Sequence, residues 1–353
     1  MFSFFTEHKP YIAQVIKKYI TAESVNLRSV SPRSAKLSGD IATLATRGKM
    51  IRGGLVCLGY QFEGKKLDER CLKLAAAMEI AHTGLLIHDD IMDGDTLRRG
   101  EKALHATHAD AGKKYGMLTP ERFGEATATC LADIAFFSAF NLLTQALAEH
   151  PEILTTAMSL FTKELALVGA AQLQDVYSGN HPQPATLATI LSTYRFKTAR
   201  YTFSLPLALG LTAASGNAKT ITTLTTFGEH VGIIFQIRDD EIGLFGTEKE
   251  IGKPVGSDIR ESKKTLYHHF LYRLASATEK KRLGHIFGNQ RLTKKDITYV
   301  RSLVTAYNIP EKIEKIVAAE RKSALAALEE LTLSVEHANL FNDIMAYTER
   351  RVS

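Results

Sequence analysis

A short acidic run followed by two arginines is the part of this sequence most suited to chemistry. Three aspartates lie within residues 89–93 (DDIMD), and Arg98 and Arg99 follow them. On a helix, Asp89 and Asp93 share one face, where the two carboxylates repel each other unless a cation lies between them. Mg²⁺ prefers oxygen ligands, and guanidinium groups bind phosphate through two hydrogen bonds. The spacing therefore predicts a site for magnesium and a phosphorylated substrate.

The alternative interpretation of this run is a solvated acidic helix end followed by a basic loop. The apolar residues 85–87 (LLI) lead directly into the aspartates. A buried approach to clustered acids costs free energy that a cation must offset. We therefore favour the metal site.

Asp239 and Asp240 repeat the arrangement later in the chain. The apolar residues 231–237 precede them, and Lys263 and Lys264 follow. Taken alone, this second pair is equally consistent with a surface turn. Because two apolar segments both end in acids and are followed by basic residues, we expect two facing walls around a diphosphate and its metal ions. Such ions offset the charge that builds on a departing oxygen.

The elements that must position these residues are predicted to be helices. Residues 67–90, 128–150 and 311–333 carry apolar side chains every three or four positions and are rich in strong helix formers. Alternating strand patterns are absent from the sequence, and most of the nine prolines lie at segment edges. We expect an all-α protein, with residues 1–353 forming a single domain.

Composition excludes several other classes of protein. The net charge is +6, but the sequence has no block of five or six like charges, which argues against a nucleic-acid partner. Three scattered cysteines without CxxC spacing suit a reducing cytosol. The N-terminus resembles an opening helix more than a signal peptide, and residues 134–148 are too short and too polar to span a bilayer. We expect a cytoplasmic protein without an integral membrane segment.

The order of short motifs resembles that of the trans-isoprenyl diphosphate synthases, also called the polyprenyl synthetase family. The likeness covers nearly the whole chain and runs through the following motifs: GKMIR (48–52), HT (82–83), DDIMD with RRG (89–100), QLQD (172–175), KT (197–198), FQ (235–236) and GK (252–253). The resemblance implies a single large helical bundle of the isoprenoid synthase type with a central cavity, assembled as a homodimer. It also implies a magnesium-dependent, head-to-tail (1'-4) condensation of isopentenyl diphosphate with an allylic diphosphate (dimethylallyl, geranyl or farnesyl).

The same resemblance assigns roles to residues of this chain. It implies that isopentenyl diphosphate is held by four residues: Lys49, Arg52, His82 and Arg99. The residues implied for binding about three Mg²⁺ ions are Asp89, Asp93 and Asp239. Those implied for the allylic diphosphate are Arg98, Lys197, Lys253 and Lys263. Those implied to face the allylic cation are Lys197, Thr198 and Gln236, with support from Asp90, Gln172, Asp175 and Asp240.

Two positions depart from the family pattern. Gly243 stands where the second acidic motif usually ends in a third aspartate, and it offers no metal ligand. We expect weaker or differently tuned metal binding from this change. Gly53 replaces a proline that commonly follows the early arginine, and we expect little effect from it.

Product length depends, by the same resemblance, on the tunnel below the first aspartates. Its predicted wall comprises Ala81, Gly84, Leu85, Phe136, Phe137 and Phe140. Because Gly84 has no side chain, the floor there is expected to be open, which favours a twenty-carbon product, geranylgeranyl diphosphate. Longer chains stay open as an alternative.

Two other functions compete with this interpretation. A class I terpene cyclase shares the acidic helix but has no need of a second diphosphate pocket built from Lys49, Arg52 and Arg99. A non-catalytic, regulatory subunit of a heteromeric prenyl synthase is favoured only by Gly243.

Overall fold

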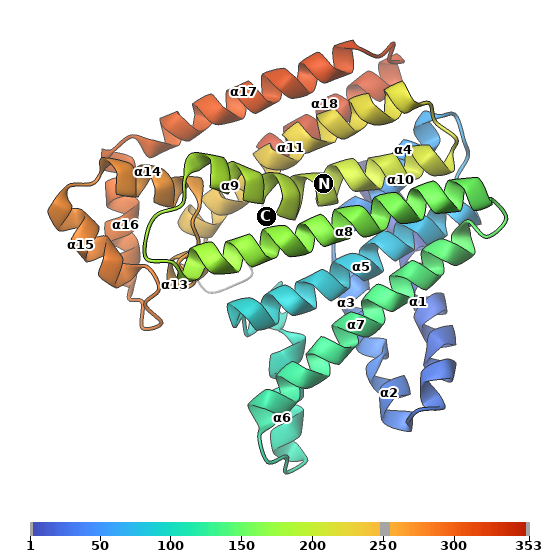
Figure 1. Ribbon diagram of the computed structural model, residues 1–353, viewed down its shortest axis with the longest axis horizontal. Helices are drawn as coiled ribbons and strands as arrows, with labels where there is room; N and C mark the ends of the chain where they lie inside the picture. Colours follow the sequence, from blue (N-terminus) through green and yellow to red (C-terminus); the bar gives the residue numbers. More distant parts are fainter. Residues whose placement is uncertain (1–2, 248–254, 351–353) are drawn as a thin grey trace. The chain divides into compact units, whose positions relative to one another are not determined.

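The computed structural model describes residues 3–247 and 255–350. Helices form nearly all of the regular structure, which confirms the all-α prediction (Figure 1). The residues group into two compact units. The first unit comprises Met1–Thr162 and Leu205–Thr222, and the second comprises Lys163–Ser204 and Thr223–Ser353.

The first unit is built mainly from eight helices and one short hairpin. Its helices are α1 (Ser3–Arg28), α2 (Pro32–Leu37), α3 (Gly39–Arg47), α4 (Ile51–Phe62), α5 (Glu69–Asp93), α6 (Leu104–Lys114), α7 (Pro120–Ala146) and α10 (Leu205–Ala213). The only strands in the described residues are β1 (Leu97–Arg98) and β2 (Glu101–Lys102), which pair antiparallel. The helix α8 (Pro151–Asn180) begins in this unit, and so does α11 (Ala218–Phe245).

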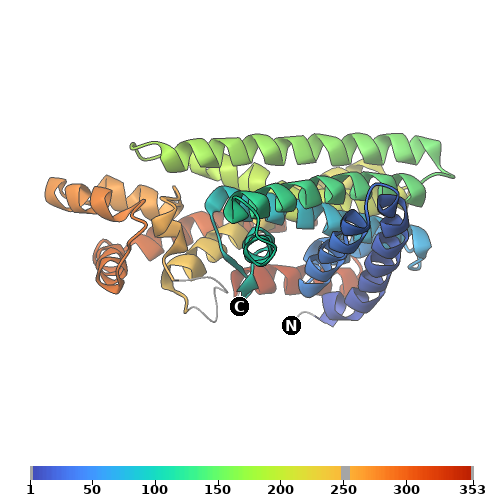
Figure 2. The same ribbon diagram turned by 90° about the horizontal axis from the view of Figure 1, so that it is seen from below.

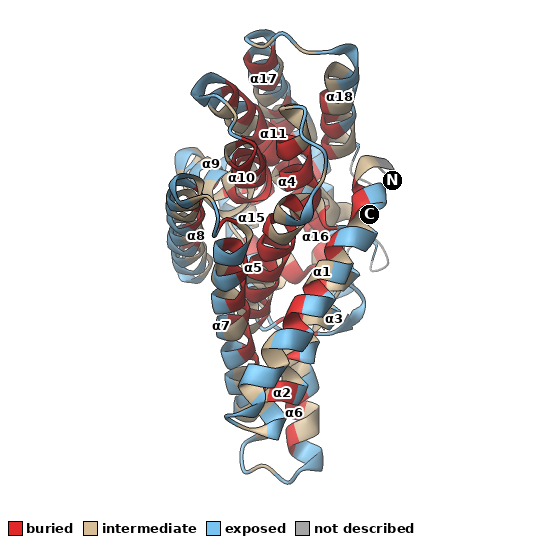
Figure 3. Cartoon of the chain, turned by 90° about the vertical axis from the view of Figure 1, so that its right-hand side faces the viewer, coloured by how far each residue is buried: buried red, intermediate tan, exposed pale blue. Residues whose placement is uncertain are grey.

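Helix α5 forms the centre of the first unit. It packs against α7, α4, α1, α3 and α10, while α6 packs on α7 (Figures 1 and 2). Residues 74–84 are all buried, and the helix is buried along most of its length in Figure 3. A helix that is apolar on all sides requires neighbours on all sides, so the sequence of α5 itself demands this central position.

Local sequence signals set the ends of α5. The Asp68 side chain accepts a hydrogen bond from the Cys71 N–H at 2.8 Å and so caps the N-terminus. Gly94, with φ of 68°, ends the helix in the left-handed conformation, and the Asp95 N–H then bonds the Asp90 carbonyl at 2.9 Å. Asp89 and Asp93 are thereby fixed in the last turns of a rigid helix.

Two glycines allow α4 and α10 to pack with their backbones almost touching. A Cβ built on Gly59 would collide with the Leu207 carbonyl oxygen, and one built on Gly210 would collide with the Val56 carbonyl oxygen. No side chain larger than hydrogen fits at either position without moving a helix.

The second unit contains the remaining elements. They are the rest of α8 and α11, with α9 (Leu187–Thr193), the π-helix η1 (Tyr194–Ser204), α13 (Ser257–Arg260), α14 (Leu266–Leu274), α15 (Ala277–Ile286), α16 (Lys294–Ala306), α17 (Ile309–Glu329) and α18 (Val335–Glu349). Phe227 of α11 stacks edge-on against Phe341 of α18, with 5.1 Å between ring centroids. This aromatic pair belongs to the core of the unit.

Two helices, α7 and α8, are long and apolar enough to cross a membrane by length and composition. The expectation that residues 134–148 are too short considered only part of α7, which begins fourteen residues earlier at Pro120. Core helices of soluble proteins have the same length and composition, so these properties are weak evidence for a membrane span.

The close approach of α4 and α10 gives a direct test of this packing. Replacing Gly210 with alanine should lower the free energy of unfolding by about 1–3 kcal/mol, because overpacking forces the two helices apart. Gly169→Ala is the matched control, since within the described part of the chain a Cβ there would meet nothing within 4 Å beyond the backbone of its own helix and its chain neighbours. Thermal or urea unfolding measures both, and equal stability of the two variants would show that the close approach is absent in solution.

Candidate active site

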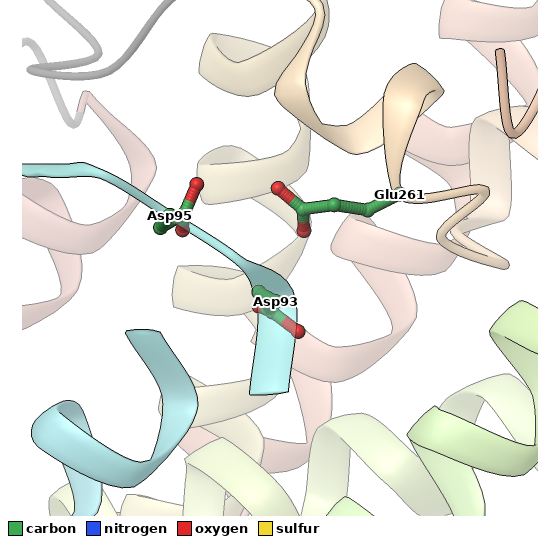
Figure 4. A group of neighbouring side chains, drawn as sticks. All are labelled: Asp93, Asp95 and Glu261. Atoms are coloured by element: carbon green, nitrogen blue, oxygen red, sulfur yellow. The ribbon is translucent and has the colours of Figure 1, made fainter. Parts of the chain in front are cut away.

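The first acidic motif lies at the C-terminal end of α5. Asp93 is the last residue of the helix, Asp95 follows Gly94, and one carboxylate oxygen of each lies within 4.8 Å of the other (Figure 4). Glu261, also drawn in Figure 4, belongs to the second unit. The C-terminus of a helix carries partial negative charge, so carboxylates are unfavourable there. This end of α5 therefore favours the binding of cations.

Arg98 supplies one cation to this acidic end from the strand β1. Its Nε donates to Asp90 Oδ1 at 2.6 Å, and its Nη2 lies 3.5 Å from Asp89 Oδ2 and 3.8 Å from Asp95 Oδ2. Burial alone would lower the pKa of Arg98, but the carboxylates of Asp90 and Asp89 raise it above its ordinary value. Because Asp90 is buried and bonded to Arg98, it is placed to support the motif.

The residues predicted for isopentenyl diphosphate come largely together in the first unit. A Cβ on Gly48 would lie 2.8 Å from Nη1 of Arg99, so the guanidinium rests against the loop 48–50, which carries Lys49 and leads into α4 and Arg52. Burial, followed by the positive charges of Arg52 and Arg99, lowers the pKa of His82 well below its usual range. His82 is thus neutral at pH 7 beside two arginines, in a cluster suited to an anion.

The backbone around this cluster holds unusual conformations. Met50 has φ of 53° and Arg99 has φ of 55°, both in the left-handed region that side-chain-bearing residues rarely adopt. Such residues concentrate at ligand-binding positions, where the surrounding structure imposes them. Lys49, next to Met50, is exposed to solvent.

In the second unit, the predicted catalytic residues lie on the π-helix η1 and on α11. Lys197 Nζ forms an ion pair with Asp175 Oδ2 at 2.6 Å, and Thr198 Oγ1 donates to Gln236 Oε1 at 2.7 Å. Gln236 Nε2 in turn donates to Asp240 Oδ1 at 2.8 Å. π-Helical segments are rare in proteins, and those that occur are often found at functional sites. The structure therefore links the predicted residues in an ion pair and a hydrogen-bonded relay.

Sequence reasoning missed Tyr194, which completes this relay. Its hydroxyl donates to Asp240 Oδ2 and accepts a hydrogen bond from the Leu266 N–H at 3.0 Å. Burial, followed by the negative charge of Asp258, raises the pKa of Asp240 well above the usual aspartate range, while the bonds from Tyr194 and Gln236 oppose this. Nothing in the sequence near Tyr194 marks it, because its partners lie 46 and 72 positions away.

The two aspartates of the second motif face different surroundings. Asp240 is buried, whereas Asp239 is exposed and so accessible to a cation, which suits its predicted role as a ligand. Lys263 forms an ion pair with Glu261 at 2.8 Å, and Gln172 is half-buried on α8. Lys253 lies outside the described residues.

Gly243 leaves space that another carboxylate occupies. A Cβ built on Gly243 would collide with Oδ2 of Asp258, which comes from α13. An acidic group therefore lies against α11 at the place where the family motif usually has its third aspartate. The sequence indicated a missing carboxylate at position 243 but gave no sign of this neighbour.

The predicted tunnel residues lie on two helices of the first unit: Ala81, Gly84 and Leu85 on α5, and Phe136, Phe137 and Phe140 on α7. Ala81 is buried and Leu85 is half-buried on α5, and a Cβ on Gly84 would lie 3.1 Å from the ring of Phe136 and 3.0 Å from the Ala132 carbonyl oxygen. The space expected to be open beside Gly84 is thus filled by α7, because the missing side chain lets the two helices approach. The Phe140 ring packs edge-to-face against Phe161, while Phe137 is 71% exposed.

The space beside Gly243 yields a prediction against simple motif repair. Gly243→Asp should lower the free energy of unfolding measured without Mg²⁺ by about 1–3 kcal/mol, because the new carboxylate must displace that of Asp258. The double variant Gly243→Asp, Asp258→Ala should recover most of that stability. Thermal unfolding measures both variants, and Gly284→Asp, at an uncrowded helix position, is the control. If Gly243→Asp is as stable as Gly284→Asp, the placement of Asp258 is contradicted.

Comparison with known proteins identifies the family. The polyprenyl synthetase family model matches residues 36–304. The chain is 32% identical to geranylgeranyl diphosphate synthase of Sulfolobus acidocaldarius over 89% of both chains, and 34% identical to that of Saccharolobus solfataricus over 68% of both. It also superposes, with a TM-score of 0.91, 25% identity and 99% coverage of both chains, on geranylgeranyl pyrophosphate synthase of Corynebacterium glutamicum, whose structure contains isoprenyl diphosphate and magnesium. These matches confirm the predicted isoprenyl synthase fold, and the chain belongs to the polyprenyl synthetase family of prenyltransferases.

Proposed function

We propose that this prenyltransferase condenses isopentenyl diphosphate head-to-tail with an allylic diphosphate and releases geranylgeranyl diphosphate. Two groups of residues in the first unit support this proposal. One is the set of carboxylates at the C-terminal end of α5, and the other is the cluster of Arg52, Arg99 and His82, of which His82 also lies on α5. The first suits a metal-bound diphosphate, and the second suits a diphosphate bound without metal. A terpene cyclase has no use for the second.

The donor atoms at the end of α5 fit magnesium. Asp89 and Asp93 offer carboxylate oxygens, the ligands that this hard cation prefers, at a helix end that repels further negative charge. Magnesium bound there supplies positive charge that stabilises the departing diphosphate. Asp239, exposed in the second unit, is a further proposed ligand.

The side chains of the chain itself position the substrates and stabilise the allylic cation. Arg98, fixed by Asp90, and Lys197, fixed by Asp175, are proposed to hold the allylic diphosphate. The Thr198 hydroxyl donates its hydrogen bond to Gln236, so its lone pairs remain available to a cation. Fixing both reactants makes carbon–carbon bond formation effectively unimolecular. The proton released at the end passes to the free diphosphate, so the mechanism needs no dedicated protein base.

The twenty-carbon product is proposed from the relatives of this chain. The Sulfolobus acidocaldarius and Saccharolobus solfataricus relatives are named geranylgeranyl diphosphate synthases. The open floor expected beside Gly84 does not support this length, because the Phe136 ring of α7 fills that space. We propose that this ring is the group that stops chain growth.

We also propose a cytoplasmic homodimer with no nucleic-acid partner and no integral membrane segment. Leu173, Val176 and Tyr177 are exposed at i, i+3 and i+4 on α8. Apolar side chains at this spacing form one stripe of a helix, which a second subunit would cover.

A product assay tests the reaction. Purified protein with Mg²⁺, labelled isopentenyl diphosphate and each allylic starter should give a discrete product that, after dephosphorylation, runs as a C20 alcohol in chromatography. Omitting Mg²⁺ is the control. If folded protein gives no product with any starter, the chain is not a stand-alone synthase, and the regulatory-subunit interpretation replaces the proposal.

The chain-length assignment has its own test. Phe136→Ala should shift the product by at least one five-carbon unit to longer chains, because it removes the ring beside Gly84. Phe137→Ala is the matched control, since that neighbouring side chain is 71% exposed. The product spectrum of each variant is read by the same chromatography. Unchanged product length in Phe136→Ala would place the limiting group elsewhere.

A further inference from the structure

The helix α4 begins without a capping side chain of its own. Its preceding residue, Met50, has φ of 53° and makes no side-chain capping hydrogen bond within the described part of the chain. The first N–H groups of any helix need acceptors from outside that helix. Here the acceptor comes from α5: the Gly53 N–H donates to Oε1 of Glu79 at 2.7 Å, and the Arg52 N–H bonds the same carboxylate.

Glu79 is a charged group with almost no access to water. It is 3% exposed, and it lies on α5 one turn before His82. Burial raises the pKa of Glu79, and the charges of Arg52 and Arg99 together with the two N–H bonds oppose that rise. A buried carboxylate is retained only where cations and hydrogen bonds offset its desolvation, and Arg52 and Arg99 are the pair assigned above to isopentenyl diphosphate.

We propose that Glu79 is a positioning residue that fixes the start of α4 and thereby holds Arg52 ready for the diphosphate of isopentenyl diphosphate. It acts through other groups: its carboxylate bonds the backbone of residues 52 and 53, and the loop 48–50 is thereby kept against Arg99. The inference rests on the proposed function, because it takes the arginine cluster as the isopentenyl diphosphate site.

Gly53 acquires a function through this bond. A proline at this position, as the family resemblance leads one to expect, has no N–H and could not make the 2.7 Å bond. Space is also limited, since a Cβ on Gly53 would lie 3.0 Å from Ile12 Cδ1 and 3.2 Å from the Ala75 carbonyl oxygen. The replacement expected to have little effect therefore provides the donor that joins α4 to α5.

Two variants of Glu79 separate positioning from charge. Glu79→Gln keeps an acceptor oxygen of similar size and loses the charge, whereas Glu79→Ala loses both. Glu79→Ala should raise KM for isopentenyl diphosphate about tenfold to a hundredfold, because misplaced binding groups cost this much. KM for the allylic diphosphate should change less than about threefold, and Glu79→Gln should recover most of the loss.

Gly53 provides a second, independent pair of variants should Glu79→Ala fail to fold. Gly53→Pro removes the N–H, and Gly53→Ala keeps it while adding the same Cβ. Gly53→Pro should therefore weaken isopentenyl diphosphate binding by a larger factor than Gly53→Ala. Calorimetric titration with inorganic diphosphate in the absence of Mg²⁺ measures binding without turnover, and circular dichroism verifies folding.

Each result decides the inference separately from the proposed function. Tighter diphosphate binding in Glu79→Ala would mean that the negative charge of Glu79 only weakens the attraction of Arg52 and Arg99 for diphosphate. An equal rise in both KM values would mean that Glu79 has a general structural role. Either result overturns the positioning role. Product formation by the unmodified protein tests the proposed function alone. If the unmodified protein is active but the variants raise both KM values equally, only the inference is refuted.

Discussion

Negative charge at the negative end of a buried helix is the constraint on which the first unit depends. Asp89, Asp90 and Asp93 occupy the last turns of α5, where the helix carbonyls already repel anions. Arg98 bonds Asp90 and approaches Asp89, which leaves an arrangement of oxygens that favours a further cation. The short hairpin of β1 and β2 carries Arg98 back to this helix end.

The same helix positions the other parts of the candidate site in the first unit. Glu79, His82, Gly84 and Asp93 follow one another along α5, and a helix rises about 1.5 Å per residue, so they span about 21 Å. Along this length α5 meets the start of α4, the arginine cluster and the Phe136 ring. Because residues 74–84 are all buried, the packing that stabilises the unit also fixes Glu79, His82 and Gly84.

Much of this arrangement could be predicted from local sequence, and some of it could not. The helical periods of α5, α7 and α17 and the order of the motifs were sufficient to predict the fold and the family. The π-helix η1 was not predicted. The bond from Tyr194 to Asp240 has no local signal, because it joins residues 46 positions apart. The position of Asp258 beside Gly243 likewise depends on how α13 packs against α11. The expectation at Gly84 erred for the same reason: a missing side chain left room for a neighbouring helix to approach.

The most direct test of the central constraint is the thermal unfolding of the protein with and without Mg²⁺ and inorganic diphosphate, compared with Asp93→Asn. A ligand that binds only the folded state raises Tm. We expect Asp93→Asn to unfold at a higher temperature than the unmodified protein without metal, because a repelling carboxylate is removed, and to lose most of the Tm increase given by Mg²⁺ and diphosphate. Equal increases in both proteins, or none in the unmodified one, would contradict the claim that the acidic end of α5 requires a cation.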